Sequence, residues 1–210
     1  MKKKFALNTF TAFLLQVITI ICNFILPRLY LQFYNSDTNG LIQSLSQFLG
    51  FISLCELGVG QVIQTSLYKP LAERNNLMIS SVVSSGKRFF RQIAYVLSVY
   101  TAILVVFFPY LASVQFDRSY IATLILAMSL NYFAQYFFGI IDSLLLNADQ
   151  RNYINSIAQI GTTILNTTLC IILIISGSSI QLVKLVSSSV LVMKPVLVHI
   201  YVKRNYEIDP

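Results

Sequence analysis

Long apolar runs separated by short polar links dominate the chain. Six of these runs reach about 20 residues, the length that an α-helix needs to cross the hydrocarbon core of a bilayer. Ile157 to Ile175 shows the strength of the pattern, because ten of its nineteen residues are Ile or Leu. The pattern predicts six membrane-spanning helices, over approximately Phe5–Phe33, Leu41–Tyr68, Ile93–Val114, Tyr120–Leu146, Ile154–Ile175 and Ile180–Val202.

The composition agrees with a membrane protein. Hydrophobic residues make up 56% of the chain and charged residues 11%, whereas soluble domains carry about a quarter of their residues as charges. The links leave no room for a soluble domain, so we expect residues 1–210 to form a single membrane domain. The first apolar run is too long for a cleaved signal peptide, and we interpret it as a retained span.

Lysine and arginine predict the orientation. Eleven of them lie in the two terminal tails and in the second-to-third and fourth-to-fifth links, whereas the opposite links carry only Arg118. By the positive-inside rule, both termini are cytoplasmic in a multi-pass protein of the cell membrane. The net charge of +7 is then explained by topology and by attraction to anionic membrane lipids, and it does not indicate nucleic acid as a partner.

The link from about Lys69 to Arg91 is the longest. Pro70 suits the first turn of a helix, and apolar residues follow at roughly helical spacing: Leu71, Leu77, Met78 and Val82. Two interpretations stay open at this point. The link forms either a short amphipathic helix on the cytoplasmic surface or a cytoplasmic extension of the second span.

No catalytic residue set, cofactor motif or metal-ligand spacing is visible. The single histidine, His199, is interpreted as an interfacial residue at the inner end of the last span. Cys22, Cys55 and Cys170 lie within spans and are interpreted as small apolar packing residues. Without a phosphate-binding loop the chain is not an ATP-driven pump. We therefore expect neither an enzyme nor a bound metal or cofactor.

Ionisable residues within the spans are the candidate functional residues. A charge near the bilayer centre costs about 2.5–3.5 kcal/mol, so such residues face a cavity or a partner. Arg28, Lys194 and Lys184 are candidates for a substrate cavity, although Arg28 and Lys184 could instead snorkel to the outer headgroups. Glu56 and Asp142 are candidates for structural ion pairs or for gating. Because cations outnumber carboxylates, an anionic substrate is favoured over a cationic drug.

Proline and glycine mark candidate hinges. Pro27 precedes Arg28, and Pro195 follows Lys194. Proline removes a helical hydrogen bond and kinks the helix. Gly58 and Gly60 allow a neighbouring backbone to approach the second span closely.

A set of short motifs recurs at the ends of the spans. They are Ile25-Leu26-Pro27-Arg28, Asn39-Gly40-Leu41, Cys55-Glu56-Leu57-Gly58-Val59-Gly60, Leu67-Tyr68-Lys69-Pro70-Leu71, Ser84 to Arg91, Leu144 to Tyr153, Lys194-Pro195 and Tyr201 to Tyr206. In order and placement this set resembles the oligosaccharide flippase (polysaccharide transporter) branch of the multidrug/oligosaccharidyl-lipid/polysaccharide exporter superfamily. The resemblance covers nearly the whole chain.

The resemblance implies a MATE-like, all-α transporter of about twelve to fourteen spans, in which two lobes rock around a central cavity. This chain then corresponds to the N-terminal lobe, and the same gene or a separate chain supplies the C-terminal lobe. The implied cargo is an undecaprenyl-pyrophosphate-linked sugar unit moved to the outer leaflet for envelope polysaccharide synthesis. Arg28 and Lys194, with Lys184 third, would meet the pyrophosphate, and Glu56 would act in structure or gating.

Two other classes stay open. A multidrug or small-solute antiporter of the same superfamily would be favoured by a cavity lined with carboxylates. A truncated membrane protein that interacts with other chains without transporting would be favoured by a stable complex that moves no lipid.

Overall fold

The computed structural model describes residues 2–56, 58–111 and 116–207. Helices account for nearly all of these residues and no strand occurs among them, so the predicted all-α class is confirmed. Five helical stretches are long and apolar enough to cross a membrane: Lys4–Leu54, Asn76–Tyr110, Arg118–Ala148, Asn152–Ile175 and Ile180–Asn205. By length and composition, these helices give the chain its membrane-embedded character.

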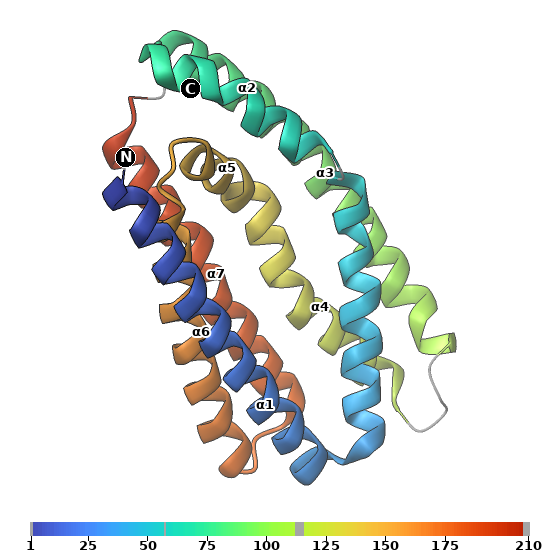
Figure 1. The fold of residues 1–210 in the computed structure, drawn as a ribbon. Coiled ribbons are helices and arrows are strands. Elements are labelled where there is room, and N and C mark those ends of the chain that lie inside the picture. Colours follow the sequence, from blue (N-terminus) through green and yellow to red (C-terminus); the bar gives the residue numbers. More distant parts are fainter. Residues whose placement is uncertain (1, 57, 112–115, 208–210) are drawn as a thin grey trace.

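The first of these stretches contains a reversal of the chain. Helix α1 spans Lys2–Gly50, but Asn35 inside it has non-helical angles, φ 69° and ψ 165°. A straight helix of that length would measure about 70 Å, more than twice the hydrocarbon thickness of a bilayer. Figure 1 shows the chain turning back after its first leg. The second leg continues through the 3₁₀ turn η1 (Phe51–Glu56) and helix α2 (Val59–Glu73).

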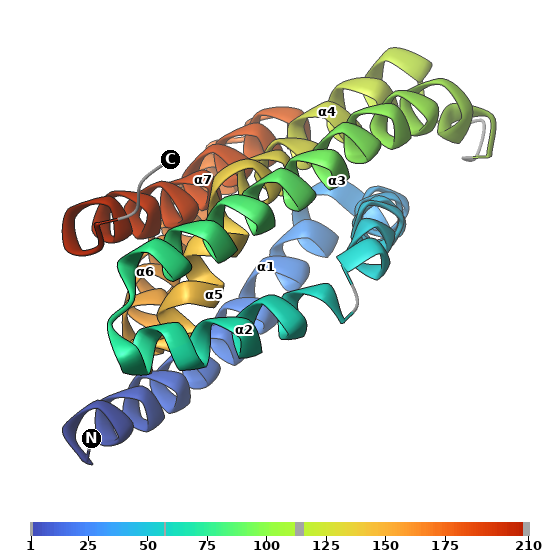
Figure 2. The same cartoon turned by 90° about the horizontal axis from the view of Figure 1, so that it is seen from above.

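The remaining spans run alternately up and down the bundle, with α4 and α5 continuing in one direction as a single span (Figures 1 and 2). Their helices are α3 (Asn76–Leu111), α4 (Arg118–Ala134), α5 (Ile140–Ala148), α6 (Asn152–Ile175) and α7 (Ile180–Asn205). A five-residue π-helical turn, η2 (Gln135–Gly139), joins α4 to α5. Five of the six predicted apolar segments are helical wherever the structure describes them, and the sixth, Leu41–Tyr68, is helical except around Gly58.

The long link after the second span does not form a helix of its own. Helix α2 runs to Glu73 and ends on Arg74, whose φ of 54° is left-handed. Helix α3 begins two residues later, where the Asn75 side chain accepts a hydrogen bond from Met78 N at 3.1 Å, as expected of a helix cap. The interpretation of this link as a separate amphipathic surface helix is thus wrong. The link is instead divided between an extended α2 and an extended α3.

The segments that carry the positive charges meet at one end of the bundle. Lys4 Nζ lies 3.4 Å from Asp149 Oδ1, joining the first segment to the fourth-to-fifth link. Asn76 Nδ2 donates to Glu207 Oε2 at 3.2 Å, joining the α2–α3 turn to the C-terminal tail. At the opposite end, the Tyr34 hydroxyl donates to the carbonyl of Ser178. We call the first of these the inner end, following the positive-inside rule.

Packing divides the bundle into two sides. Helix α1 packs mainly against α6, whereas α2 packs mainly against α3 and α5. Helix α6 buries several polar side chains: Asn155, Ser156, Thr162, Asn166 and Thr167. Polar side chains hold helices together where lipid removes the hydrophobic driving force for association. The two legs that flank the Asn35 reversal share one hydrophobic core near that reversal, whereas the continuation of the second leg in α2 packs on α3 and α5 rather than on α6.

Candidate functional site

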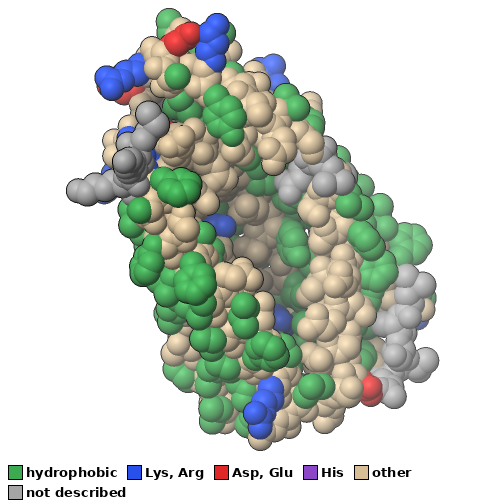
Figure 3. All heavy atoms as spheres, viewed as in Figure 1, with side chains coloured by type: hydrophobic (Ala, Val, Ile, Leu, Met, Phe, Trp, Pro, Cys, Tyr) green, Lys and Arg blue, Asp and Glu red, His purple; other side chains and the backbone are tan. Residues whose placement is uncertain are grey.

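A hollow lies between the first leg of α1 and α2, and Lys or Arg side chains are visible inside it (Figure 3). We call this hollow the central cleft. A cavity of about 540 Å³ lies at the inner end between the same two helices. Its lining includes Lys4 from α1, Tyr68 and Leu71 from α2, and Asp149 from the α5–α6 turn. This volume falls within the roughly 300–1,000 Å³ of typical ligand sites.

Helix α7 presents half-buried side chains along one side. We call this row the lysine stripe, and its members are Lys184, Ser187, Leu191 and Lys194. At about 100° and 1.5 Å per residue, the two lysines lie roughly 80° apart around the axis and about 15 Å apart along it. Buried Val183 and Val198 lie on the same side, whereas Leu185 and Leu197 are exposed. Both lysines are therefore on the inward side of α7.

Lys184 is held against the α1 side of the bundle. Its Nζ lies 4.5 Å from the centre of the Tyr30 ring, and Tyr30 is only 5% exposed. This is a cation–π contact, which attracts an ammonium group without neutralising its charge. Lys194 forms no ion pair, hydrogen bond or ring contact within the described residues. The stripe thus carries two cations that no carboxylate in the described part of the chain compensates.

Pro195 fixes the backbone beside Lys194. A Cβ atom placed on Gly139 would lie 2.8 Å from Pro195 Cβ, closer than two carbon atoms can approach. Gly139 is the last residue of η2, and π-helical turns occur often at functional sites. Pro195, which interrupts the hydrogen bonding of α7, therefore packs against the π-helical turn η2. The contact is possible because Gly139 has no side chain.

We expect Gly139→Ala to lower stability by about 1–3 kcal/mol, because the added methyl overpacks this contact. Gly161→Ala is the matched control, since a Cβ there meets nothing within 4 Å and alanine is about 1 kcal/mol better than glycine in a helix. Thermal unfolding of the purified variants in detergent measures both. Equal midpoints for the two variants would contradict the close contact between Gly139 and Pro195.

Arg28 is not brought to the lysine stripe. It is exposed on α1 and forms no hydrogen bond or ion pair with the described side chains. It lies two residues before Tyr30, which places it about 200° away around the helix axis. Because Tyr30 faces Lys184, Arg28 points to the other side of α1. The structure thus groups Lys184 with Lys194 and leaves Arg28 apart.

The other predicted hinge and gating residues are scattered. The side chain of Glu56 lies outside the described residues, although its backbone ends η1. Gly58 has a φ of 86° and separates η1 from α2, so the second span is broken there. A Cβ on Gly60 would contact the side chain of Leu144 in α5 at 3.8 Å. Pro27 is half-buried in α1, which continues through it.

Asp142 pairs with the histidine. The carboxylate is fully buried, and its Oδ2 lies 2.6 Å from Nδ1 of His199. The sequence left Asp142 open between a structural ion pair and a gating role and did not name His199 as its partner. The partner was missed because the two residues are 57 positions apart, and their common depth at the inner ends of two spans was the only available signal. His199 lies five residues after Lys194, about 140° around α7, and about 60° from the more distant Lys184, so it faces away from Lys194 in particular.

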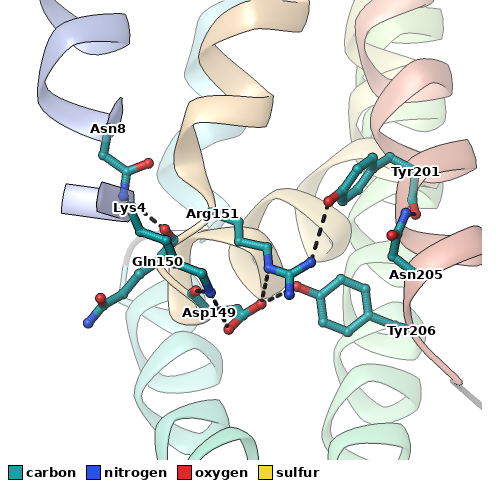
Figure 4. A network of polar contacts seen from close by, with 8 residues as sticks. All are labelled: Lys4, Asn8, Asp149, Gln150, Arg151, Tyr201, Asn205 and Tyr206. Atoms are coloured by element: carbon teal, nitrogen blue, oxygen red, sulfur yellow. Dashed lines mark hydrogen bonds and ion pairs between the residues drawn. The ribbon is translucent and has the colours of Figure 1, made fainter. Parts of the chain in front are cut away.

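A polar network closes the inner end (Figure 4). Asp149 Oδ2 accepts a hydrogen bond from the Tyr206 hydroxyl at 2.6 Å and lies 2.7 Å from Arg151 Nε, while Oδ1 faces Lys4. Burial, together with the bond to Asp149, raises the pKa of Tyr206, so the phenol stays protonated and acts as the donor. The network joins α1, the α5–α6 turn and the end of α7, and the sequence assigned no role to Asp149.

Among the described residues, no group of three His, Cys, Asp or Glu side chains is placed to hold a metal ion. Cys22 and Cys170 are buried free thiols, while the side chain of Cys55 lies outside the described residues. Searches with this chain found no matching family model, curated protein or solved structure. Fold and site define an α-helical membrane protein that has a central cleft and two half-buried lysines on the inward side of α7.

Proposed function

We propose that the chain forms the N-terminal lobe of a flippase that moves a lipid-linked, anionic oligosaccharide across the cytoplasmic membrane by alternating access. The observation that carries this proposal is the lysine stripe. Lys184 and Lys194 are half-buried on the inward side of one helix, and no described carboxylate pairs with either. A cation placed at this depth is costly unless a cavity or a ligand stabilises it.

The chemistry of the stripe suits a pyrophosphate. A lysine ammonium offers three donors and no acceptor, and charge-assisted hydrogen bonds to phosphate oxygens are about twice as strong as neutral ones. The separation of about 15 Å along α7 is too long for both lysines to bind one phosphate. Lys194 lies nearer the inner end and Lys184 nearer the outer end. They therefore supply successive contacts along one path across the membrane.

The shape of the cleft supports an amphiphilic cargo. The hollow opens on the face seen in Figure 3, rather than being enclosed by helices on all sides. A lipid-linked sugar can then place its charged head in the cleft while its chain stays in the bilayer. A second lobe facing this opening would complete the cavity, as in transporters built from repeated halves.

Asp142 and His199 favour a second candidate, a proton-coupled antiporter of small solutes. A buried carboxylate bonded to an imidazole is a titratable pair of the kind that relays protons within membranes. Its histidine lies about 140° around α7 from Lys194, and neither lysine of the stripe contacts it. The pair therefore identifies no cargo, and it supports this candidate less strongly than the stripe supports the flippase.

Two measurements test the proposal. The full-length gene should restore envelope polysaccharide in a strain that lacks its oligosaccharide flippase. The purified chain should bind an undecaprenyl-pyrophosphate-linked sugar more tightly than a neutral polyprenol. Proton-driven efflux of a small cation, without restored polysaccharide, would favour the antiporter. Failure of both complementation and selective binding would overturn the flippase.

A further inference from the structure

A second basic pocket, whose lining includes neither lysine of the stripe, lies near the inner end of the bundle. It has a volume of about 210 Å³ and opens between α3, η2 and α7. Its polar lining comes from Lys87 and Arg91 of α3, Tyr136 of η2 and His199 of α7, and Phe137 and Phe138 form its edge. The volume is below the roughly 300 Å³ minimum of typical ligand sites. It therefore suits a compact charged group rather than a whole drug-sized molecule.

The charges of the pocket favour an anion. Lys87 and Arg91 are four residues apart and so lie on one face of α3. The one carboxylate beneath them, Asp142, is bonded to His199 through Nδ1 at 2.6 Å and also lies within electrostatic range of Lys87. Because Nδ1 faces Asp142, the other ring nitrogen, Nε2, is available to the pocket. The pocket stays net positive whether or not His199 is protonated.

The surroundings of the pocket favour a lipid. Phe137 is 41% exposed, Phe138 is 54% exposed and Tyr95 is 60% exposed. Tyr95 lies one turn after Arg91 along α3, and its ring contacts that of Phe137 at 6.5 Å between centres. An apolar, exposed aromatic surface thus continues from the basic pocket toward the middle of the bilayer. This order, cations first and aromatic rings next, matches the order of a phospholipid headgroup and its acyl chains.

We propose that the pocket between α3, η2 and α7 binds the phosphate of an anionic phospholipid from the inner leaflet, with Lys87 and Arg91 as its principal ligands. His199 donates from Nε2 when it is protonated, and Asp142 positions its ring. The acyl chains lie over Phe137, Phe138 and Tyr95. This site is separate from the lysine stripe, so it does not depend on the proposed transport function.

The test is native mass spectrometry of the purified chain with equal amounts of phosphatidylglycerol and phosphatidylcholine. The chain is expected to retain phosphatidylglycerol preferentially. A direct hydrogen bond to a charged group contributes at least about 1.5 kcal/mol, or about tenfold. Lys87→Gln combined with Arg91→Gln should therefore weaken phosphatidylglycerol binding by about 100-fold. Lys87→Arg keeps the charge and should retain most of the affinity.

The matched control is Arg88→Gln combined with Lys203→Gln, which removes the same charge from exposed positions at the same end. A defined pocket predicts a change of less than about threefold for this control, because neither side chain contacts the bound lipid and exposed charges contribute little. An equal loss in both double variants would show general attraction to a charged surface and overturn the site. Displacement of the lipid by millimolar inorganic phosphate would show that free phosphate is the ligand and overturn the lipid assignment. Thermal unfolding confirms that each variant is folded.

Discussion

Lys194→Gln is expected to lower the affinity of the chain for a pyrophosphate-linked lipid by about 10- to 100-fold. The reason is that a hydrogen bond to a charged group contributes about 1.5–3 kcal/mol, and Lys194 has no partner in the described residues that would keep it from a ligand. Lys194→Arg preserves the charge and should retain most of the binding. The measurement is binding of the labelled lipid to the purified chain, followed by complementation with the full-length gene.

The control for this prediction is Lys203→Gln, which removes one charge from an exposed position near the end of the same helix. It should leave binding within about twofold, since exposed charges contribute little. Lys184→Gln is expected to fall between the two, because Lys184 already has a cation–π contact with Tyr30. If Lys194→Gln and Lys203→Gln bind the lipid equally well, the lysine stripe is not the binding surface.

The second large effect concerns stability. Asp149→Ala is expected to lower the free energy of unfolding by about 2–3 kcal/mol, because it removes the acceptor shared by Lys4, Arg151 and Tyr206. Breaking a fully buried ion pair costs about 3–5 kcal/mol. The Asp149 side chain is 24% exposed, which reduces that figure. At about 2–4 °C per kcal/mol for a chain of this size, the midpoint of thermal unfolding should fall by roughly 5–10 °C.

The Glu73→Ala variant serves as the control. Glu73 pairs with Lys69 at 3.9 Å, and both side chains are more than half exposed, so the loss should stay below about 0.5 kcal/mol. A double-mutant cycle with Tyr206→Phe isolates the hydrogen bond to Asp149. The cost of Asp149→Ala should be smaller in the Tyr206→Phe background, because contacting residues are not additive. Full additivity would show that the Tyr206–Asp149 contact contributes nothing to the fold.

The apolar pattern was sufficient for predictions that depend on local spacing. Helix character follows from the length of the runs, because a membrane interior forces the backbone to satisfy its own hydrogen bonds. The first two predicted spans leave a link between Phe33 and Leu41, and the reversal at Asn35 lies in that link. The charge tally correctly grouped the tails and links that share one end. The boundary of α2 and α3 was missed because helical spacing continues on both sides of Arg74, and a single left-handed residue ends the helix.

The candidate site residues also divide into those that local sequence patterns reveal and those that only long-range contacts reveal. The sequence singled out Lys184, Lys194 and Asp142 as candidates, because charges inside apolar runs stand out individually. It also grouped Arg28 with them, which the geometry of α1 does not support. The pairing of Asp142 with His199 and the network around Asp149 join segments that are distant in the chain. No local spacing encodes those contacts.

By itself, the sequence determined three properties: the helical, apolar character of the chain, the number of its apolar segments, and which segments share an end. These properties depend on the free energy of placing each residue in lipid or water, which is a sum over local composition. Only the tertiary structure decided which side of each helix faces the cleft, which charges have partners and where Pro195 packs against Gly139. Those outcomes depend on the rotation and approach of whole helices, which long-range packing fixes.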